Sequence, residues 1–313
     1  MGYCIARRTL PILSHNWRRS LSLLMIGTSL LAFCAGAKSA APPCRSAGTG
    51  DLRFHMPKSK LLHNSRTLRI LLPPAYDAPE SKSTQYPVLY MLDGEDLFDV
   101  CENTRRHQDW KFDKTVYRLI GEKTISPMIV VGIDSAAGDR NRTREYLPYQ
   151  DVANESPFAE PRGNRLPFFV TDEVMPFVAK RYRVLHDHDH TGIGGSSYGG
   201  IAALYTLLAK PHRFGLALIE SPPLWVGMGQ LVRDTSPLIA HPVRIYIGIG
   251  ENEVPVPSYA AQSVELVRQL QANFKAAGYD DTNMRVVVEP GGEHSTEDWA
   301  RRLPAALTFL YGP

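Results

Sequence analysis

The chain has 313 residues, 43% of them hydrophobic, which is enough to bury a sizeable core in one large domain or two small ones, and it fits no fibrous or disordered class. Its formal net charge of +3 is misleading, because five basic residues and no acidic ones lie in the first 39 positions. The remaining chain is slightly acidic, which excludes a broadly basic nucleic-acid-binding surface.

The first 39 residues have the pattern of an export signal. Two arginine pairs precede an apolar run at 21–35, and the small residues at 37–39 offer a cleavage site. The run is shorter than the roughly 20 residues that span a bilayer. We therefore predict a signal peptide at 1–39 and a single domain at 40–313. The mature protein should be periplasmic or secreted, without stable membrane insertion. Either the Sec or the twin-arginine route could export it.

Cysteine and histidine spacings give no strong metal signal. Only Cys44 and Cys101 remain after the predicted cleavage, and in an oxidising compartment they could pair or stay free. The run His186-Asp-His-Asp-His190 contains three histidines, but alternate residues on an extended segment do not converge well on one ion. We expect a solvated loop there, and neither a metal nor a cofactor.

Apolar patterning along the chain predicts alternating strands and helices. We expect strands at 52–56, 67–72, 87–92, 128–133, 191–196, 214–219, 243–249 and 284–288. We expect helices at 110–120, 168–182 with a kink or break at Pro176, 198–209, 258–277 and 297–311. A long polar loop at 134–165 should be functional. The alternation predicts a mostly parallel sheet of about eight strands with helices on both faces.

The segment Gly195-Ser196-Ser197-Tyr198-Gly199 matches the G-x-S-x-G pattern of a nucleophile elbow. It lies between a predicted strand and a predicted helix, which is the context such an elbow needs. Gly195 and Gly199 flank Ser197 because a Cβ at either position would clash where strand and helix approach closely. Ser197 is therefore the candidate nucleophile.

A serine hydroxyl needs a histidine base, which a carboxylate in turn orients. Sites in open parallel sheets form at the carboxyl ends of the strands. Of the histidines after Ser197, only His294 follows such an end, whereas His212 and His241 lie at the opposite edge. His294 is therefore the candidate base.

Three glutamates leave strands at the same edge and are candidates for the acid. Glu251 and Glu253 follow the strand at 243–249, and Glu220 ends the strand at 214–219. Spacing alone does not decide among them. The tetrahedral oxyanion also needs two donors, which we assign to the backbone N–H of Tyr198 and to that of Glu95, or of Gly94, after the strand at 87–92.

Several motifs in order resemble those of the putative-esterase family of α/β hydrolases, which includes enterochelin, salmochelin and feruloyl esterases, S-formylglutathione hydrolase and the antigen 85 mycolyltransferases. These motifs are LPPAY (72–76), YPVLYMLDG (86–94), RTREYLP (142–148), the elbow, ESPPLW (220–225) and the terminal EH with Trp299. The resemblance implies an α/β-hydrolase fold with Ser197 as nucleophile and His294 as base. It further implies Glu253, which follows Asn252, as the acid, and Glu95 as the second oxyanion donor.

These patterns predict a secreted serine carboxylic-ester hydrolase that works through an acyl-enzyme. A siderophore lactone, a feruloyl or acetyl carbohydrate, or a similar small ester would be its substrate. The alternatives are an acyltransferase of the antigen 85 type and a non-catalytic binding protein on the same fold. Trp225 would line the pocket or pack in the core. Arg142 would contact substrate or pair with a carboxylate and order the long loop.

Overall fold

The computed structural model describes residues 50–98, 109–150, 161–235 and 243–313. All of them fall within one compact unit, Cys44–Pro313. The predicted signal peptide, both cysteines of the mature chain and His241 lie outside the described residues, so the predictions that concern them stay predictions. No helix in the described part of the chain is both long and apolar enough to cross a bilayer.

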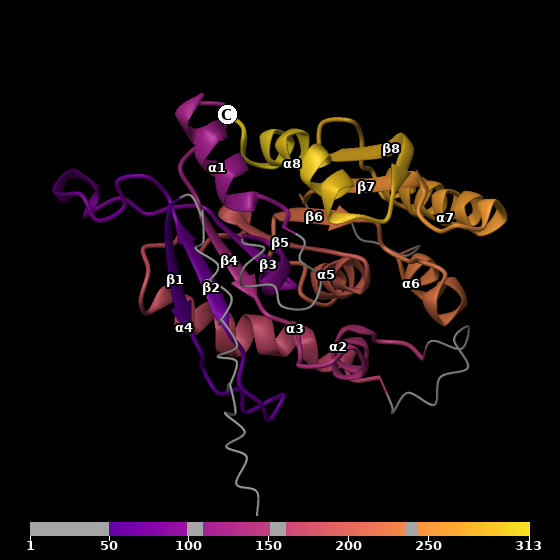
Figure 1. Cartoon of the computed structure of the whole chain (residues 1–313), viewed down its shortest axis with the longest axis horizontal. Helices are drawn as coiled ribbons and strands as arrows, with labels where there is room; N and C mark the ends of the chain where they lie inside the picture. Colours follow the sequence, from indigo (N-terminus) through magenta and orange to yellow (C-terminus); the bar gives the residue numbers. More distant parts are fainter. Residues whose placement is uncertain (1–49, 99–108, 151–160, 236–242) are drawn as a thin grey trace, which may run out of the picture. The chain divides into compact units, whose positions relative to one another are not determined.

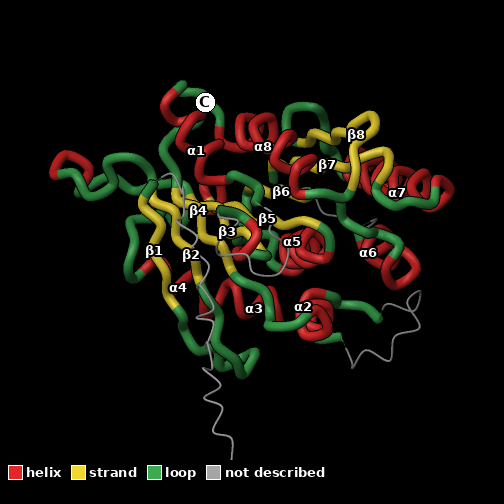
Figure 2. Tube along the Cα trace, in the orientation of Figure 1, coloured by secondary structure: helices red, strands yellow, loops and turns green. Residues whose placement is uncertain are grey.

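Eight strands form a single sheet in the order β1-β2-β4-β3-β5-β6-β7-β8 (Figures 1 and 2). Their bounds are β1 Asp51–His55, β2 Leu68–Leu72, β3 Val88–Leu92, β4 Ile129–Ile133, β5 Thr191–Ser196, β6 Leu216–Glu220, β7 Arg244–Asn252 and β8 Met284–Glu293. The strands from β4 to β8 are mutually parallel, whereas β1 and β2 join the edge antiparallel. The predicted, mostly parallel sheet of an α/β hydrolase is confirmed.

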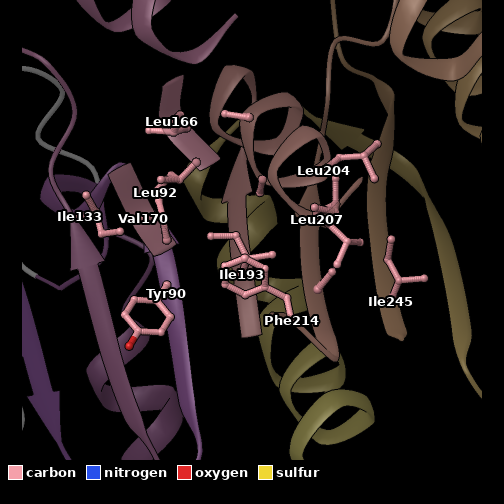
Figure 3. Close-up of a cluster of buried hydrophobic side chains, with 14 of the residues drawn as sticks. Tyr90, Leu92, Ile133, Leu166, Val170, Ile193, Leu204, Leu207, Phe214 and Ile245 are labelled. Carbon is pink, nitrogen blue, oxygen red and sulfur yellow. The ribbon is translucent and has the colours of Figure 1, made fainter. Parts of the chain in front are cut away.

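Two apolar cores lie on the two faces of this sheet, because alternate residues of a strand point to opposite faces. The helices are α1 Phe112–Gly121, α2 Asp139–Tyr146, α3 Leu166–Phe168, α4 Met175–Ala179, α5 Tyr198–Ala209, α6 Gln230–Asp234, α7 Pro257–Ala276 and α8 Thr296–Tyr311. On β3, Leu89 and Met91 pack with α1 and α8. Tyr90 and Leu92 face the other core, with Val170 and Leu204 among its helical residues (Figure 3).

Several segments differ from the sequence-based expectations. The helix α6 was not expected, and β7 and β8 extend to Asn252 and Glu293, beyond the predicted ends at 249 and 288. The predicted loop at 134–165 contains the helix α2, whose buried positions include Arg142 and Thr143 rather than an apolar stripe, so apolar periodicity gave no signal. The predicted helix at 168–182 begins at Leu166 and ends at Ala179, with a π-helical segment, Phe169–Val174, between α3 and α4. Pro176 lies in the first turn of α4, where its missing N–H is tolerated.

Candidate active site

Ser197 occupies a strained turn between β5 and α5. Its backbone has φ 55° and ψ −129°, a conformation that residues other than glycine rarely adopt. A Cβ at Gly195 would lie 2.5 Å from the carbonyl oxygen of Gly199, and one at Gly199 would lie 2.6 Å from Oδ2 of Asp93. The predicted reason, close approach of strand and helix, is therefore confirmed for Gly195, whereas Gly199 makes room for Asp93 in the loop after β3.

His294 and Glu253 come together from the ends of neighbouring strands. His294 directly follows β8 and Glu253 directly follows β7, and His294 Nδ1 lies 2.5 Å from Glu253 Oε2. The Glu253 side chain is 5% exposed and that of His294 is 33% exposed. Because Nδ1 is engaged, Nε2 is the ring nitrogen left for a substrate-side partner.

Ser197 and His294 line the same cavity, which has a volume of about 190 Å³ and is also lined by Glu253. Among the described residues, no hydrogen bond joins Ser197 to His294. Hydrogen bonds between nucleophile and base are often long in unliganded enzymes and shorten when substrate binds. The predicted nucleophile, base and acid thus surround one small cavity.

The surroundings of Glu253 keep its carboxylate ionised. Burial by itself raises the pKa of this group, but hydrogen bonds bring the net pKa below its ordinary value. The donors are His294, the Ser221 hydroxyl at 2.6 Å and the Gly250 N–H at 2.6 Å. An ionised carboxylate at Nδ1 stabilises the imidazolium that forms when His294 takes a proton.

The other two glutamates that spacing allowed have different partners. Glu251 accepts a hydrogen bond from the Gly291 N–H at 3.1 Å. Glu220 is fully buried and pairs with Arg302 at 2.8 Å. Of the three candidates, Glu253 is the one bonded to His294, as the resemblance implied.

Ser221 and Trp299 complete a ring of contacts around His294 that the sequence analysis missed. Trp299 Nε1 donates to Ser221 Oγ at 2.8 Å, and Ser221 Oγ donates to Glu253. The Trp299 ring meets the imidazole nearly perpendicularly, at 84°, with the centroids 5.2 Å apart. Two signals pointed to Ser221 without giving it a role: its place in the motif ESPPLW (220–225) and its position directly after β6, at the same sheet edge as the other candidates.

The two predicted oxyanion donors come from different segments at this edge. Tyr198 is the first residue of α5, where backbone N–H groups have no partner within the helix. Glu95 lies in the single 3₁₀ turn Gly94–Asp96 that follows β3. Its carboxyl accepts from the Ser135 N–H at 2.9 Å and from the Ser135 hydroxyl, which fixes the loop. Burial, and then the neighbouring Asp93 and Asp134, raise the pKa of Glu95.

Arg142 lies against Asp93 rather than in the small cavity. Its Nε and one terminal nitrogen donate to the two carboxylate oxygens of Asp93 at 2.6 and 2.7 Å. The guanidinium also stacks near the rings of Tyr146 and Tyr198. This bidentate pair favours the expectation that Arg142 orders its loop over the one that it contacts substrate.

Trp225 has both of the roles considered for it. It is half-buried, packs against the core that contains α5, and lines the cavity beside Ser197. It also lines a neighbouring apolar cavity of about 600 Å³, together with Met228, Val254 and Leu266.

The histidine run at 186–190 forms local pairs. His188 Nδ1 lies 2.8 Å from Asp189, and His190 Nδ1 lies 2.6 Å from Asp187. Over the described ranges, no group of three His, Cys, Asp or Glu side chains is placed to hold a metal ion. The imidazoles of His188 and His190 thus each have a carboxylate neighbour in the loop itself.

Comparison with known proteins places this geometry in a family. The family model described as "Putative esterase" matches residues 59–310. An iron(III) enterobactin esterase of Dickeya dadantii (strain 3937) is 29% identical over 181 residues, which cover 56% of this chain and 34% of that protein. The chain therefore spans about a third of the length of that relative.

Two further proteins match over more of their length. The Bacillus subtilis (strain 168) protein YbbA, which is uncharacterised, is 22% identical over 251 residues, covering 79% of this chain and 93% of YbbA. The solved structure of a ferulic acid esterase superposes with a TM-score of 0.64 at 19% identity, covering 84% of this chain and 98% of that one. At this identity the structural likeness shows the fold.

Proposed function

Because the chain belongs to the putative-esterase family and is a carboxylic ester hydrolase, we propose that it cleaves its substrate by nucleophilic catalysis at Ser197. The observation that carries this proposal is the cavity shared by Ser197 and His294, the latter held at Nδ1 by a buried carboxylate. His294 is the base in this mechanism and Glu253 is the acid that orients it.

The reaction proceeds in two halves. As Ser197 Oγ bonds to the ester carbonyl carbon, its proton passes to Nε2 of His294. The negative charge that forms on the carbonyl oxygen is stabilised by the N–H groups of Tyr198 and Glu95, each worth about 3 kcal/mol of barrier. The C–O bond to the alcohol then breaks, and the leaving alkoxide takes the proton from His294. Water attacks the acyl-enzyme with His294 again as base, which releases the carboxylic acid and restores Ser197.

We propose a small ester outside the cytoplasm as the substrate, either a siderophore lactone or a feruloyl or acetyl carbohydrate. The support is the likeness to an enterobactin esterase and to a ferulic acid esterase, together with the export pattern of residues 1–39. Comparing hydrolysis of ferric catecholate lactones, feruloylated sugars and short p-nitrophenyl esters would choose among these substrates. Fractionation of the expressing cells would test the location.

Replacing the nucleophile tests the mechanism. Ser197→Ala should abolish hydrolysis of p-nitrophenyl acetate and labelling by a fluorophosphonate probe. Ser196→Ala, at the last residue of β5, is the matched control and should keep the labelling. Full hydrolysis by Ser197→Ala would refute the mechanism, and a wild-type protein that hydrolyses no ester and takes no label would favour a binding protein. Transfer of the acyl group to an added sugar, detected among the products, would indicate an acyltransferase.

A further inference from the structure

A second polar cavity of about 600 Å³ lies at the carboxyl ends of β3 and β4 and shares no lining residue with the cavity beside Ser197. The segments after both strands contribute to it, through Glu95 in the 3₁₀ turn after β3 and Asp134 directly after β4. Five arginines line it, namely Arg66, Arg69, Arg144, Arg162 and Arg165. Five guanidinium groups around one cavity concentrate positive charge there, and this charge needs negative partners.

The carboxylates of the cavity balance only part of this charge. Arg66 pairs with Glu145, and Arg69 pairs with Asp134 at 2.7 Å. The third acidic residue, Glu95, is held by Ser135. Three arginines thus remain without a carboxylate within ion-pair distance in the parts of the chain that the structure describes, namely Arg144, Arg162 and Arg165.

Arg144 in addition carries a buried donor that no group in the described residues satisfies. Its Nε is buried and has no hydrogen-bond partner among the described residues. A buried donor without an acceptor is costly, so this cavity is suited to a ligand that supplies an acceptor. The backbone of Arg162 is fixed beside that of Arg144, because the main-chain N–H of Arg162 donates to the Arg144 carbonyl oxygen at 2.6 Å. Planar guanidinium groups that line one cavity suit the oxygen pairs of carboxylates and phosphates.

We propose that this cavity binds a small oxyanion through Arg144, Arg162 and Arg165. The ligand carries carboxylate or phosphate groups, and its negative charge balances the three arginines that have no carboxylate partner among the described residues. Nothing in ester cleavage at Ser197 requires this site, so it is a separate property of the molecule. Its ligand would also lie against Glu95 and Ser135, in the loop that presents the second oxyanion donor.

Isothermal titration of the purified protein with citrate and with inorganic phosphate tests the proposal, at constant ionic strength held with chloride. We expect saturable binding of at least one of them. Binding of citrate alone identifies a carboxylate site, and binding of phosphate alone identifies a phosphate site. Arg144→Gln should weaken the affinity at least tenfold, because a charge-assisted hydrogen bond is lost. Arg140→Gln is the matched control, since Arg140 is exposed on the same helix and does not line the cavity.

The proposal fails if neither anion binds at millimolar concentration, or if Arg140→Gln weakens binding as much as Arg144→Gln does. Arg162→Gln provides the same comparison should Arg144→Gln not fold, which circular dichroism would reveal. Because the measurement is a binding heat and not a rate, it is independent of whether Ser197 is the nucleophile.

Discussion

Glu253 is the residue on which the orientation of His294 depends. We expect Glu253→Gln to lower kcat for p-nitrophenyl acetate on the order of 10³-fold or more, because a neutral amide neither stabilises the imidazolium nor fixes its tautomer. Glu251→Gln is the control, since Glu251 bonds to Gly291 instead and should leave kcat unchanged. Equal losses in both variants would contradict the assignment of Glu253.

Ser221 supports Glu253 from a strained backbone position, with φ 45°. Ser221→Gly removes the hydroxyl while tolerating that φ, so its effect isolates the lost hydrogen bonds. We expect kcat to fall roughly tenfold, as for a lost hydrogen bond to a charged group. Because the Ser221 hydrogen bond lowers the pKa of Glu253, the acidic limb of the pH–rate profile should move to higher pH. A lower rate with an unmoved profile would reduce Ser221 to a packing role.

The sequence predicted Ser197 and His294 because strand ends and chain order confine them to one edge. The spacing left three candidate acids open. Which carboxylate reaches His294 Nδ1 depends on how far β7 extends past the ends of its neighbouring strands, and the sequence does not show this. The Ser221–Trp299 contact joins residues 78 positions apart, from β6 to α8, and no local pattern encodes such a contact.

At the scale of elements, β5 and α5 were predicted to the residue, whereas α2 was missed. The strand and the helix around Ser197 are apolar and buried, so their periodicity is readable. The buried face of α2 depends on the Arg142–Asp93 ion pair, a partner that lies 49 residues away in the sequence. A helix stabilised by a distant charge shows no hydrophobic period of its own.

The close approach of α5 to the loop after β3 gives an element-scale prediction. Gly199→Ala would place a methyl group 2.6 Å from Asp93 Oδ2 and displace the pair with Arg142. We expect a destabilisation of about 1–3 kcal/mol, as for overpacking, and a lower kcat. Gly121→Ala in α1 is the control, because its Cβ would meet nothing within 4 Å. Denaturant unfolding measures both variants, and equal stabilities would contradict the prediction.

Across the whole molecule, the parallel sheet brings the loops after β3, β5, β6, β7 and β8 to one edge, and α8 ties that edge to the core behind it. Arg302 of α8 reaches between the strand ends to both Glu220 and Glu289. A Cβ at Gly248 would lie 2.4 Å from Glu220 Oε2, so β7 has a glycine where this carboxyl needs room. The sheet thus has a buried charged cluster beside the candidate site, since Arg302 also donates to Ser221 Oγ at 3.4 Å.

This cluster makes the stability of the fold depend on pH. Burial raises the pKa of Glu220 from 4.5 to about 7, although Arg302 acts in the opposite direction. Between these two values the folded state holds a proton that the unfolded state has lost, so the contribution of Glu220 to stability is full below pH 4.5 and declines as the pH rises through about 7. The loss is on the order of 3 kcal/mol. Glu253, whose pKa is lowered, acts in the acid range below this window.

Glu220→Gln removes the titrating group and keeps its shape, so it isolates this contribution. We compare denaturant unfolding near pH 5 and near pH 7. From the lower to the higher pH, the unfolding free energy should fall by more in the wild type than in the variant. The informative quantity is the change of unfolding free energy with pH and not its value at one pH. The amide also weakens the pairing with Arg302, and this adds a roughly constant offset at both pH values. Parallel pH dependences in the two proteins would mean that Glu220 stays ionised beside Arg302 throughout, and that the ion pair outweighs burial at the end of β6.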